Sequence, residues 1–163
     1  MTTRTRPAMF LLIAALLSGC ASSGPPAGAP APALAAPDSN SQTFTLADHR
    51  GQVVLIDFWA TWCPPCVQAS PHIQALHEKY AANPDVEIIT VYASSRGNPS
   101  EYASEHGYTY RIIPDGAPIA RAWNVTSLPT FIVVGRDGEI VYSKLGYYAG
   151  DESKLDQAIQ DAL

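Results

Sequence analysis

Cys63 and Cys66 are the residues of this 163-residue chain whose type and spacing point most directly to chemistry. They come directly after an apolar run, where a strand is expected to end and a helix to begin, so the two thiols lie one helical turn apart. The positive end of a helix dipole stabilises a thiolate at such a place. A dithiol of this kind exchanges with a partner's sulfur atoms and alternates between two thiols and a redox disulfide. We expect Cys63, nearer the surface, to be the nucleophile, and Cys66, one turn further in, to be the resolving thiol.

The residues beside the two cysteines bear on the direction of electron flow and on contact with a partner. Pro64 and Pro65 lack an N–H, so fewer amides can stabilise the Cys63 thiolate than in a motif with ordinary residues there. A less stable thiolate makes the couple less oxidising, and the pattern therefore favours a reductant over an oxidant. We expect Trp62 to be a partly exposed apolar contact for the partner, and Pro64 and Pro65 to contribute to the same substrate-binding surface.

Asp57 interrupts an otherwise continuous apolar run, residues 53–58, that is typical of a central strand covered on both faces. Burial away from cations raises the pKa of a carboxyl group toward neutrality, which suits a general base for the Cys66 thiol. The alternative is an aspartate at the edge of a strand and in contact with water. The apolar neighbours of Asp57 disfavour that alternative.

The N-terminal residues 1–19 have the features of an export signal, because Arg4 and Arg6 precede an apolar stretch too short to span a membrane. The sequence that follows, Leu-Ser-Gly-Cys at residues 17–20, resembles the lipobox of bacterial lipoproteins, in which the cysteine becomes the lipidated first residue. The resemblance implies that Cys20 attaches the protein to a lipid bilayer. An ordinary cleavage site with a free cysteine is the alternative.

A lipidated Cys20 implies an extracytoplasmic protein, anchored to a bacterial membrane and facing the periplasm, or exposed at the cell surface. Ala21 is not the aspartate that often retains lipoproteins at the inner membrane, which favours the outer membrane. Residues 20–40, rich in Ala and Pro, have no periodic apolar pattern and are expected to form the lipidated N-terminus and a disordered linker. Such a linker spans about 25 Å as a coil and roughly 60 Å when extended.

Residues 41–163 have the size of one domain with one core. The formal net charge of the chain is −5 and its pI is near 5.2, with no basic stripe, so nucleic acid is not expected as a partner. Apolar periodicity and the Asp137-Gly138 hairpin signal predict alternating strands and helices. The expected extended segments are 43–46, 53–58, 86–92, 108–113, 130–134 and 139–144, and the expected helices are 65–80, 99–106, 118–123 and 151–163.

This order predicts an α/β fold in which a parallel βαβ half is followed by a ββα half. With Cys-x-x-Cys at the first strand-to-helix turn, it resembles the thioredoxin fold, a central mixed sheet flanked by helices. The residues that carry the resemblance are Asp57-Phe58-Trp59-Ala60, Trp62-Cys63-Pro64-Pro65-Cys66, Pro71 and Leu128-Pro129-Thr130. Residues 99–123 resemble the αβ insertion of the TlpA and ResA-like thiol-disulfide oxidoreductases, members of the redoxin family.

The resemblance implies an enzyme, a protein-disulfide reductase that works by dithiol–disulfide exchange and needs no cofactor beyond Cys63 and Cys66. It implies that Asp57 relays protons for Cys66, and that Pro129 is a cis-proline facing the cysteines. The backbone of Leu128 would then pair with an extended substrate segment. The implied partners are protein thiols and disulfides as substrates and an upstream membrane electron donor of the thiol type.

One departure limits what the resemblance implies. ResA-like cytochrome-maturation proteins usually carry an uncharged residue where this chain has Asp57, and a glutamate where it has Ala69. A role in reducing apocytochrome c is therefore not carried over to this chain.

Three alternatives to a disulfide reductase remain. Cys63, Cys66, His72 and His77 offer zinc-type ligands, but they are strung along one helix, too far apart for one tetrahedral site, and no metal is expected. A peroxiredoxin-like antioxidant would need a threonine where Ala60 stands. The third alternative is a binding lipoprotein that keeps the fold without the chemistry. Such a protein would have no need to keep Cys63, Cys66, Asp57 and Pro129 together, which disfavours this alternative.

Overall fold

The computed structural model describes residues 24–163, and both the export signal and Cys20 lie outside the described residues. No helix within residues 24–163 is long and apolar enough to cross a membrane. The strands are β1 (Ala35–Pro37), β2 (Thr43–Thr45), β3 (Val53–Trp59), β4 (Val86–Tyr92), β5 (Arg111–Ile113), β6 (Thr130–Val134) and β7 (Ile140–Leu145). The helices are the short η1 (Leu46–His49), α1 (Pro64–Tyr80), α2 (Pro99–His106), α3 (Ala117–Ala122) and α4 (Asp151–Ala162).

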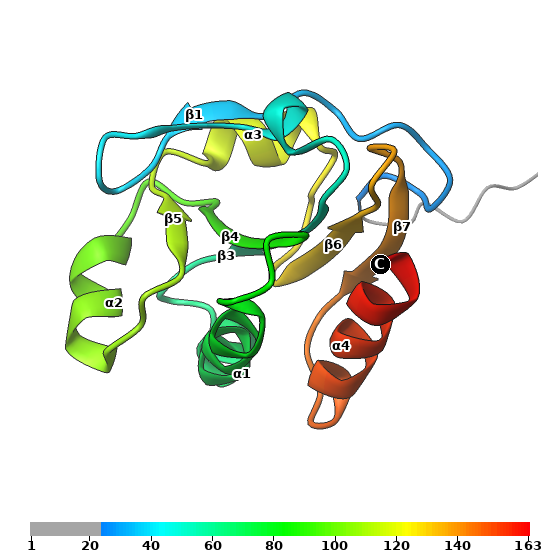
Figure 1. Ribbon diagram of the computed structural model, residues 1–163. Coiled ribbons are helices and arrows are strands. Elements are labelled where there is room, and N and C mark those ends of the chain that lie inside the picture. The colour runs from blue at the N-terminus through cyan, green and yellow to red at the C-terminus, as the bar shows by residue number, and fades with distance from the viewer. Residues whose placement is uncertain (1–23) are drawn as a thin grey trace, which may run out of the picture.

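Five strands form a mixed sheet in the order β5-β4-β3-β6-β7. β3 pairs in parallel with β4, and β4 with β5, whereas β6 and β7 run antiparallel to their neighbours. Figure 1 shows α1, α2 and α4 below this sheet and β1 with α3 above it. The expected α/β architecture, a thioredoxin fold, is confirmed.

The central strand β3 is buried along its whole length, as its continuous apolar sequence predicts. Side chains alternate between the two faces of the sheet, so Val53 and Leu55 pack with α1 and α4 below, and Val54 and Ile56 pack with the layer above. Trp59, the last residue of β3, packs with both cysteines, so the strand ends beside them.

Residues 24–40 differ from the expected linker, because they pack against the domain. Leu34 is only 2% exposed. The Gly28 amide donates to the Ile140 carbonyl at 2.7 Å, the Ala31 amide donates to the Gly138 carbonyl at 3.0 Å, and β1 pairs with β2. Backbone hydrogen bonds and one buried leucine hold this segment in place without any periodic apolar pattern. The expectation of a free linker and of a domain that begins at residue 41 is corrected accordingly.

Candidate active site

Cys63 and Cys66 form a disulfide at the start of α1, with their Cα atoms 5.2 Å apart. Cys63 is the residue that caps the helix, and its Sγ accepts a hydrogen bond from the Cys66 amide at 3.3 Å. Pro64 and Pro65 occupy the first two helical positions, where a missing N–H costs no intrahelical hydrogen bond. Cys63 is 5% exposed and Cys66 is 1% exposed, so Cys63 is the nearer of the two to the surface.

Trp62 is held beside the disulfide by two neighbours on the loop after β4. Its indole N–H donates to the Ser94 hydroxyl at 2.9 Å, and the Arg96 guanidinium lies 4.8 Å from the ring centroid. The side chain is nevertheless 50% exposed, as expected for a contact with a partner. These two contacts restrict the conformations of a large apolar side chain at the surface next to the disulfide.

The peptide bond between Leu128 and Pro129 is cis, as the resemblance implied. Pro129 is buried and Leu128 is partly exposed just before β6. The Thr130 hydroxyl donates to the Ser127 carbonyl at 2.8 Å, which fixes the turn that carries this bond. Leu128 packs against the cluster that contains Cys63 and Cys66, so the structure brings these sequence-predicted residues together.

A groove of about 600 Å³ runs beside the disulfide. One wall is formed by Trp62, Cys63, Pro64 and Pro65, and the other by α3 and residues 125–128. The sequence predicted the residues of the first wall and Leu128 as site residues, but it did not predict α3. The helix is positioned by a contact with the end of β4, and the two elements are far apart in the sequence. The groove lining is mostly apolar and includes Leu128, which precedes the cis bond.

Gly116 explains why α3 lies so close to the end of β4. Its amide donates to the Tyr92 carbonyl at 3.0 Å, and a Cβ at this position would lie 2.3 Å from Cγ1 of Val91 and 2.9 Å from that carbonyl. Only glycine permits this approach. The second wall of the groove therefore depends on a residue without a side chain.

Asp57 lies on the face of β3 that α1 covers, between Leu55, which packs with α1, and Trp59, which packs against the cysteines. It is 3% exposed, and its Oδ1 has no hydrogen-bond partner among residues 24–163. Burial raises the pKa of Asp57 to about 8. The expected burial and the expected direction of the pKa shift are confirmed, while the role as a base for Cys66 stays a prediction.

The alternative metal ligands are not brought together. Cys63 and Cys66 are joined to each other, His72 stacks on Tyr147 at 5.7 Å, and His77 lines a separate pocket near Arg111. Within the part of the chain that the structure describes, no group of three or more His, Cys, Asp or Glu side chains could hold a metal ion. This geometry does not favour the metal alternative.

The fold and the site define a thioredoxin-fold protein with a redox-active pair of cysteines. Residues 26–159 match the Redoxin family, and the chain belongs to that family.

Two curated relatives and one solved structure illustrate the likeness. The thiol-disulfide oxidoreductase ResA of Geobacillus kaustophilus is 31% identical over 69% of this chain and 66% of its own length. The thioredoxin-like protein YneN of Bacillus subtilis is 31% identical over 64% of this chain and 66% of its own. A Chlorobium tepidum protein, provisionally named thiol:disulfide interchange protein DsbE, has a TM-score of 0.76 at 27% identity, over 84% of this chain and 97% of that one. The chain thus spans just under two thirds of the length of these two curated relatives.

Proposed function

We propose that this protein is a membrane-anchored, extracytoplasmic thiol-disulfide oxidoreductase that reduces disulfides in other proteins. The observation that carries the proposal is the Cys63–Cys66 disulfide at the start of α1, beside a groove that ends at the cis bond between Leu128 and Pro129. The names of its ResA relatives agree with this activity.

In the proposed reaction, the Cys63 thiolate attacks one sulfur of a target disulfide. The target's S–S bond breaks, a mixed disulfide forms, and the released sulfur takes a proton from water. The Cys66 thiol then gives its proton to the Asp57 carboxylate and attacks Cys63 Sγ. The mixed disulfide breaks and the target leaves with both of its sulfurs reduced. Two electrons have passed from the cysteine pair to the target, and an upstream membrane donor of the thiol type restores the pair.

The direction of electron flow follows from the amides near Cys63. Cys66 supplies the nearest N–H, at 3.3 Å from Sγ, because Pro64 and Pro65 have none to offer. With few amides nearby, the Cys63 thiolate is weakly stabilised. The Cys63–Cys66 couple therefore has a lower reduction potential than that of a strong oxidant. The protein is therefore a donor of electrons to its targets.

The membrane anchor is Cys20, proposed on the Leu-Ser-Gly-Cys sequence alone. The packed segment makes the tether much shorter than a free linker would, since the Gly24 amide donates to the Asn124 carbonyl at 2.9 Å. Three residues lie between Cys20 and Gly24, and the four residue steps from Cys20 to Gly24 can span at most about 14 Å. Residues 125–128 line the groove, so Gly24 lies close to the redox site, and a lipid attached to Cys20 would keep that site near the membrane. Targets close to the bilayer surface are then the favoured ones.

A redox titration tests the direction of electron flow. The protein is equilibrated with glutathione buffers, and its disulfide fraction is read by thiol alkylation. We expect a potential near the thioredoxin value of about −270 mV, whereas a potential near the DsbA value of about −120 mV would contradict a reductant. A Pro65→Ala variant returns one amide to the motif and should be more oxidising by up to about 30 mV, the equivalent of 1.4 kcal/mol.

A further inference from the structure

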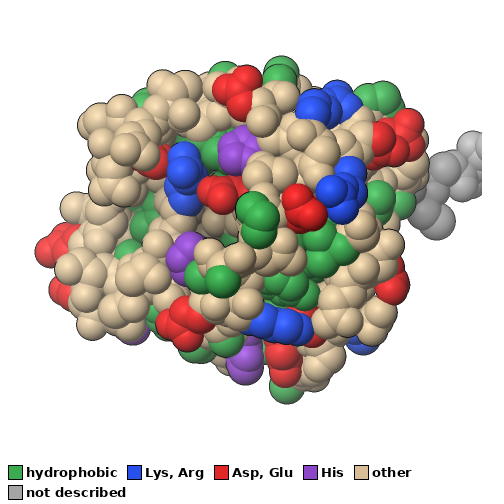
Figure 2. Space-filling model, in the orientation of Figure 1, with side chains coloured by type: hydrophobic (Ala, Val, Ile, Leu, Met, Phe, Trp, Pro, Cys, Tyr) green, Lys and Arg blue, Asp and Glu red, His purple; other side chains and the backbone are tan. Residues whose placement is uncertain are grey.

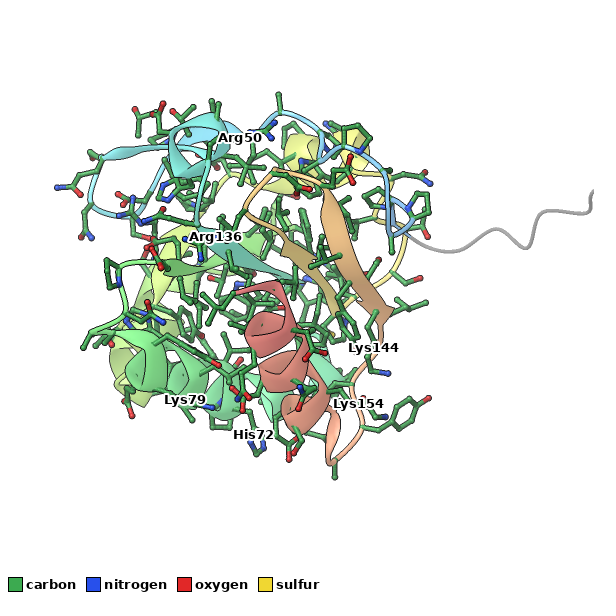
Figure 3. The ribbon with its side chains drawn as sticks, turned by 45° about the vertical axis from the view of Figure 1, so that its right-hand side comes forward. Arg50, His72, Lys79, Arg136, Lys144 and Lys154 are labelled. Atoms are coloured by element: carbon green, nitrogen blue, oxygen red, sulfur yellow. A yellow bond between two sulfur atoms is a disulfide. The ribbon has the colours of Figure 1, made fainter. Side chains whose placement is uncertain are left out.

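The positively charged side chains of this acidic protein differ in whether they pair with a carboxylate. Within residues 24–163, five of the eight Lys and Arg side chains pair with a carboxylate: Lys79, Arg111, Arg136, Lys144 and Lys154. Figure 3 shows four of them, Lys79 on α1, Arg136 between β6 and β7, and Lys144 and Lys154 near the start of α4. In Figure 2, acidic and basic side chains are interspersed over the face shown. The remaining three, Arg50, Arg96 and Arg121, have no ion pair within residues 24–163.

Two of these three arginines lie at the redox site. Arg121, in the last turn of α3, is exposed, and it is the one charged residue among those that line the groove beside Cys63. Arg96 lies over the Trp62 ring at the rim. The Arg121 guanidinium has no carboxylate partner and lies beside an otherwise uncharged groove, so it is available for an ion pair with a carboxylate of a bound segment.

We propose that the groove selects target segments that carry an acidic side chain next to the disulfide to be reduced. The proposal rests on the reductase function and assigns to Arg121 the recognition of that acid. The chain has a net charge of −5, so an acidic target is repelled over most of the surface and attracted at this groove. A basic target gains no partner in the groove, since no carboxylate lines it.

The position of Arg121 is set by the same contact that builds the groove. Gly116 holds the start of α3 against the Tyr92 carbonyl, and the Trp123 and Asn124 amides donate to the Arg121 carbonyl at the other end of the helix. Residues 125–128 then lead directly to the cis bond that faces the disulfide. A segment paired with the Leu128 backbone would therefore present side chains beside its cysteine to Arg121.

The test compares two synthetic peptides, each closed by one internal disulfide and identical except for Asp or Lys beside both cysteines. For each peptide, kcat/KM is measured with the reduced protein and divided by the rate with dithiothreitol, which removes differences in the reactivity of the peptides themselves. The preference is the Asp value divided by the Lys value. A general effect of Arg121 on the Cys63 thiolate changes both values equally and cancels in this ratio.

We expect a preference of about fivefold in the wild type, the upper range for a partly exposed ion pair. Arg121→Gln should bring the ratio close to one, and Arg121→Glu should reverse it. The matched control is Arg50→Glu, which makes the same change in net charge. Arg50 packs on Gly138, which follows β6, whereas Pro129 precedes that strand. Arg50 is therefore at the opposite end of β6 from the redox site, and Figure 3 shows it in the loop at the top of the molecule.

Arg50→Glu should keep the wild-type preference. An equal preference in the wild type and Arg121→Glu overturns the proposal, and so does an equal loss in Arg50→Glu, because net charge alone would then explain the effect. Equal reduction of both peptides by the wild type overturns the selectivity while the reductase function stands. No reduction of either peptide overturns both.

Discussion

Replacing Asp57 by Asn should make the protein more stable at neutral pH while slowing its chemistry. The carboxyl is 3% exposed, and burial raises its pKa from 3.8 to about 8. A group whose folded pKa is raised binds its proton more tightly in the folded state than in the unfolded state. The stability that the bound proton contributes is complete below pH 3.8 and is lost as the pH rises toward 8.

The size of this effect follows from the two pKa values. Each pH unit between them costs about 1.4 kcal/mol, so the free energy of unfolding should fall by about 2.5 kcal/mol between pH 5 and pH 7 because of Asp57 alone. By pH 7 the loss relative to acid conditions is about 4 kcal/mol. An asparagine has no proton to lose, so Asp57→Asn should lack this slope.

Urea unfolding of the disulfide form at pH 5, 6 and 7 measures the slope directly. The control is Asp48→Asn, the same replacement at an exposed position in η1, which should keep the wild-type slope. In stopped-flow assays, resolution of the mixed disulfide should quicken with pH up to about 8 in the wild type and lose that dependence in Asp57→Asn. Equal slopes of stability against pH in the wild type and Asp57→Asn would refute the argument that Asp57 is a buried carboxyl with a raised pKa.

Three further predictions concern the surroundings of the disulfide. Leu34→Ala should lower the free energy of unfolding by about 2–4 kcal/mol in urea, since Leu34 is buried, whereas a free linker would give no change. Gly116→Ala should cost about 1–3 kcal/mol in the same assay and reduce activity with protein substrates, because the added Cβ meets Val91 and displaces α3. Trp62→Ala should raise KM for a protein disulfide severalfold with little effect on unfolding or on reduction of a small disulfide, since half of this side chain is exposed.

The sequence predicted the elements that carry strong local signals. The bounds of β4, α2 and β6 agree with the periodicity of their residues, and α1 begins one residue before the expected Pro65. The dithiol at the start of a helix and the buried Asp57 could also be inferred, because each depends on residues adjacent in the chain.

The features that sequence reasoning missed depend on contacts between distant residues. Residues 24–40 have little apolar periodicity, and their order comes from hydrogen bonds to the β6–β7 turn and from the buried Leu34. Arg121 enters the groove because Gly116 packs on β4, and a single glycine gives no sign of its distant neighbour. β5 begins at Arg111, later than the expected residue 108, and the rings of Tyr108 and Tyr110 in the segment before it stack at 5.4 Å.

The central claim is that Cys63 attacks a target disulfide and Cys66 resolves the product. The most direct test is to incubate reduced Cys66→Ser protein with a disulfide-bonded protein substrate and to look for the mixed disulfide by non-reducing electrophoresis and mass spectrometry. We predict a stable adduct through Cys63, which dithiothreitol releases, and no adduct with Cys63→Ser under the same conditions. Adduct formation through Cys66 in the Cys63→Ser protein, or no adduct in either variant, would contradict the account.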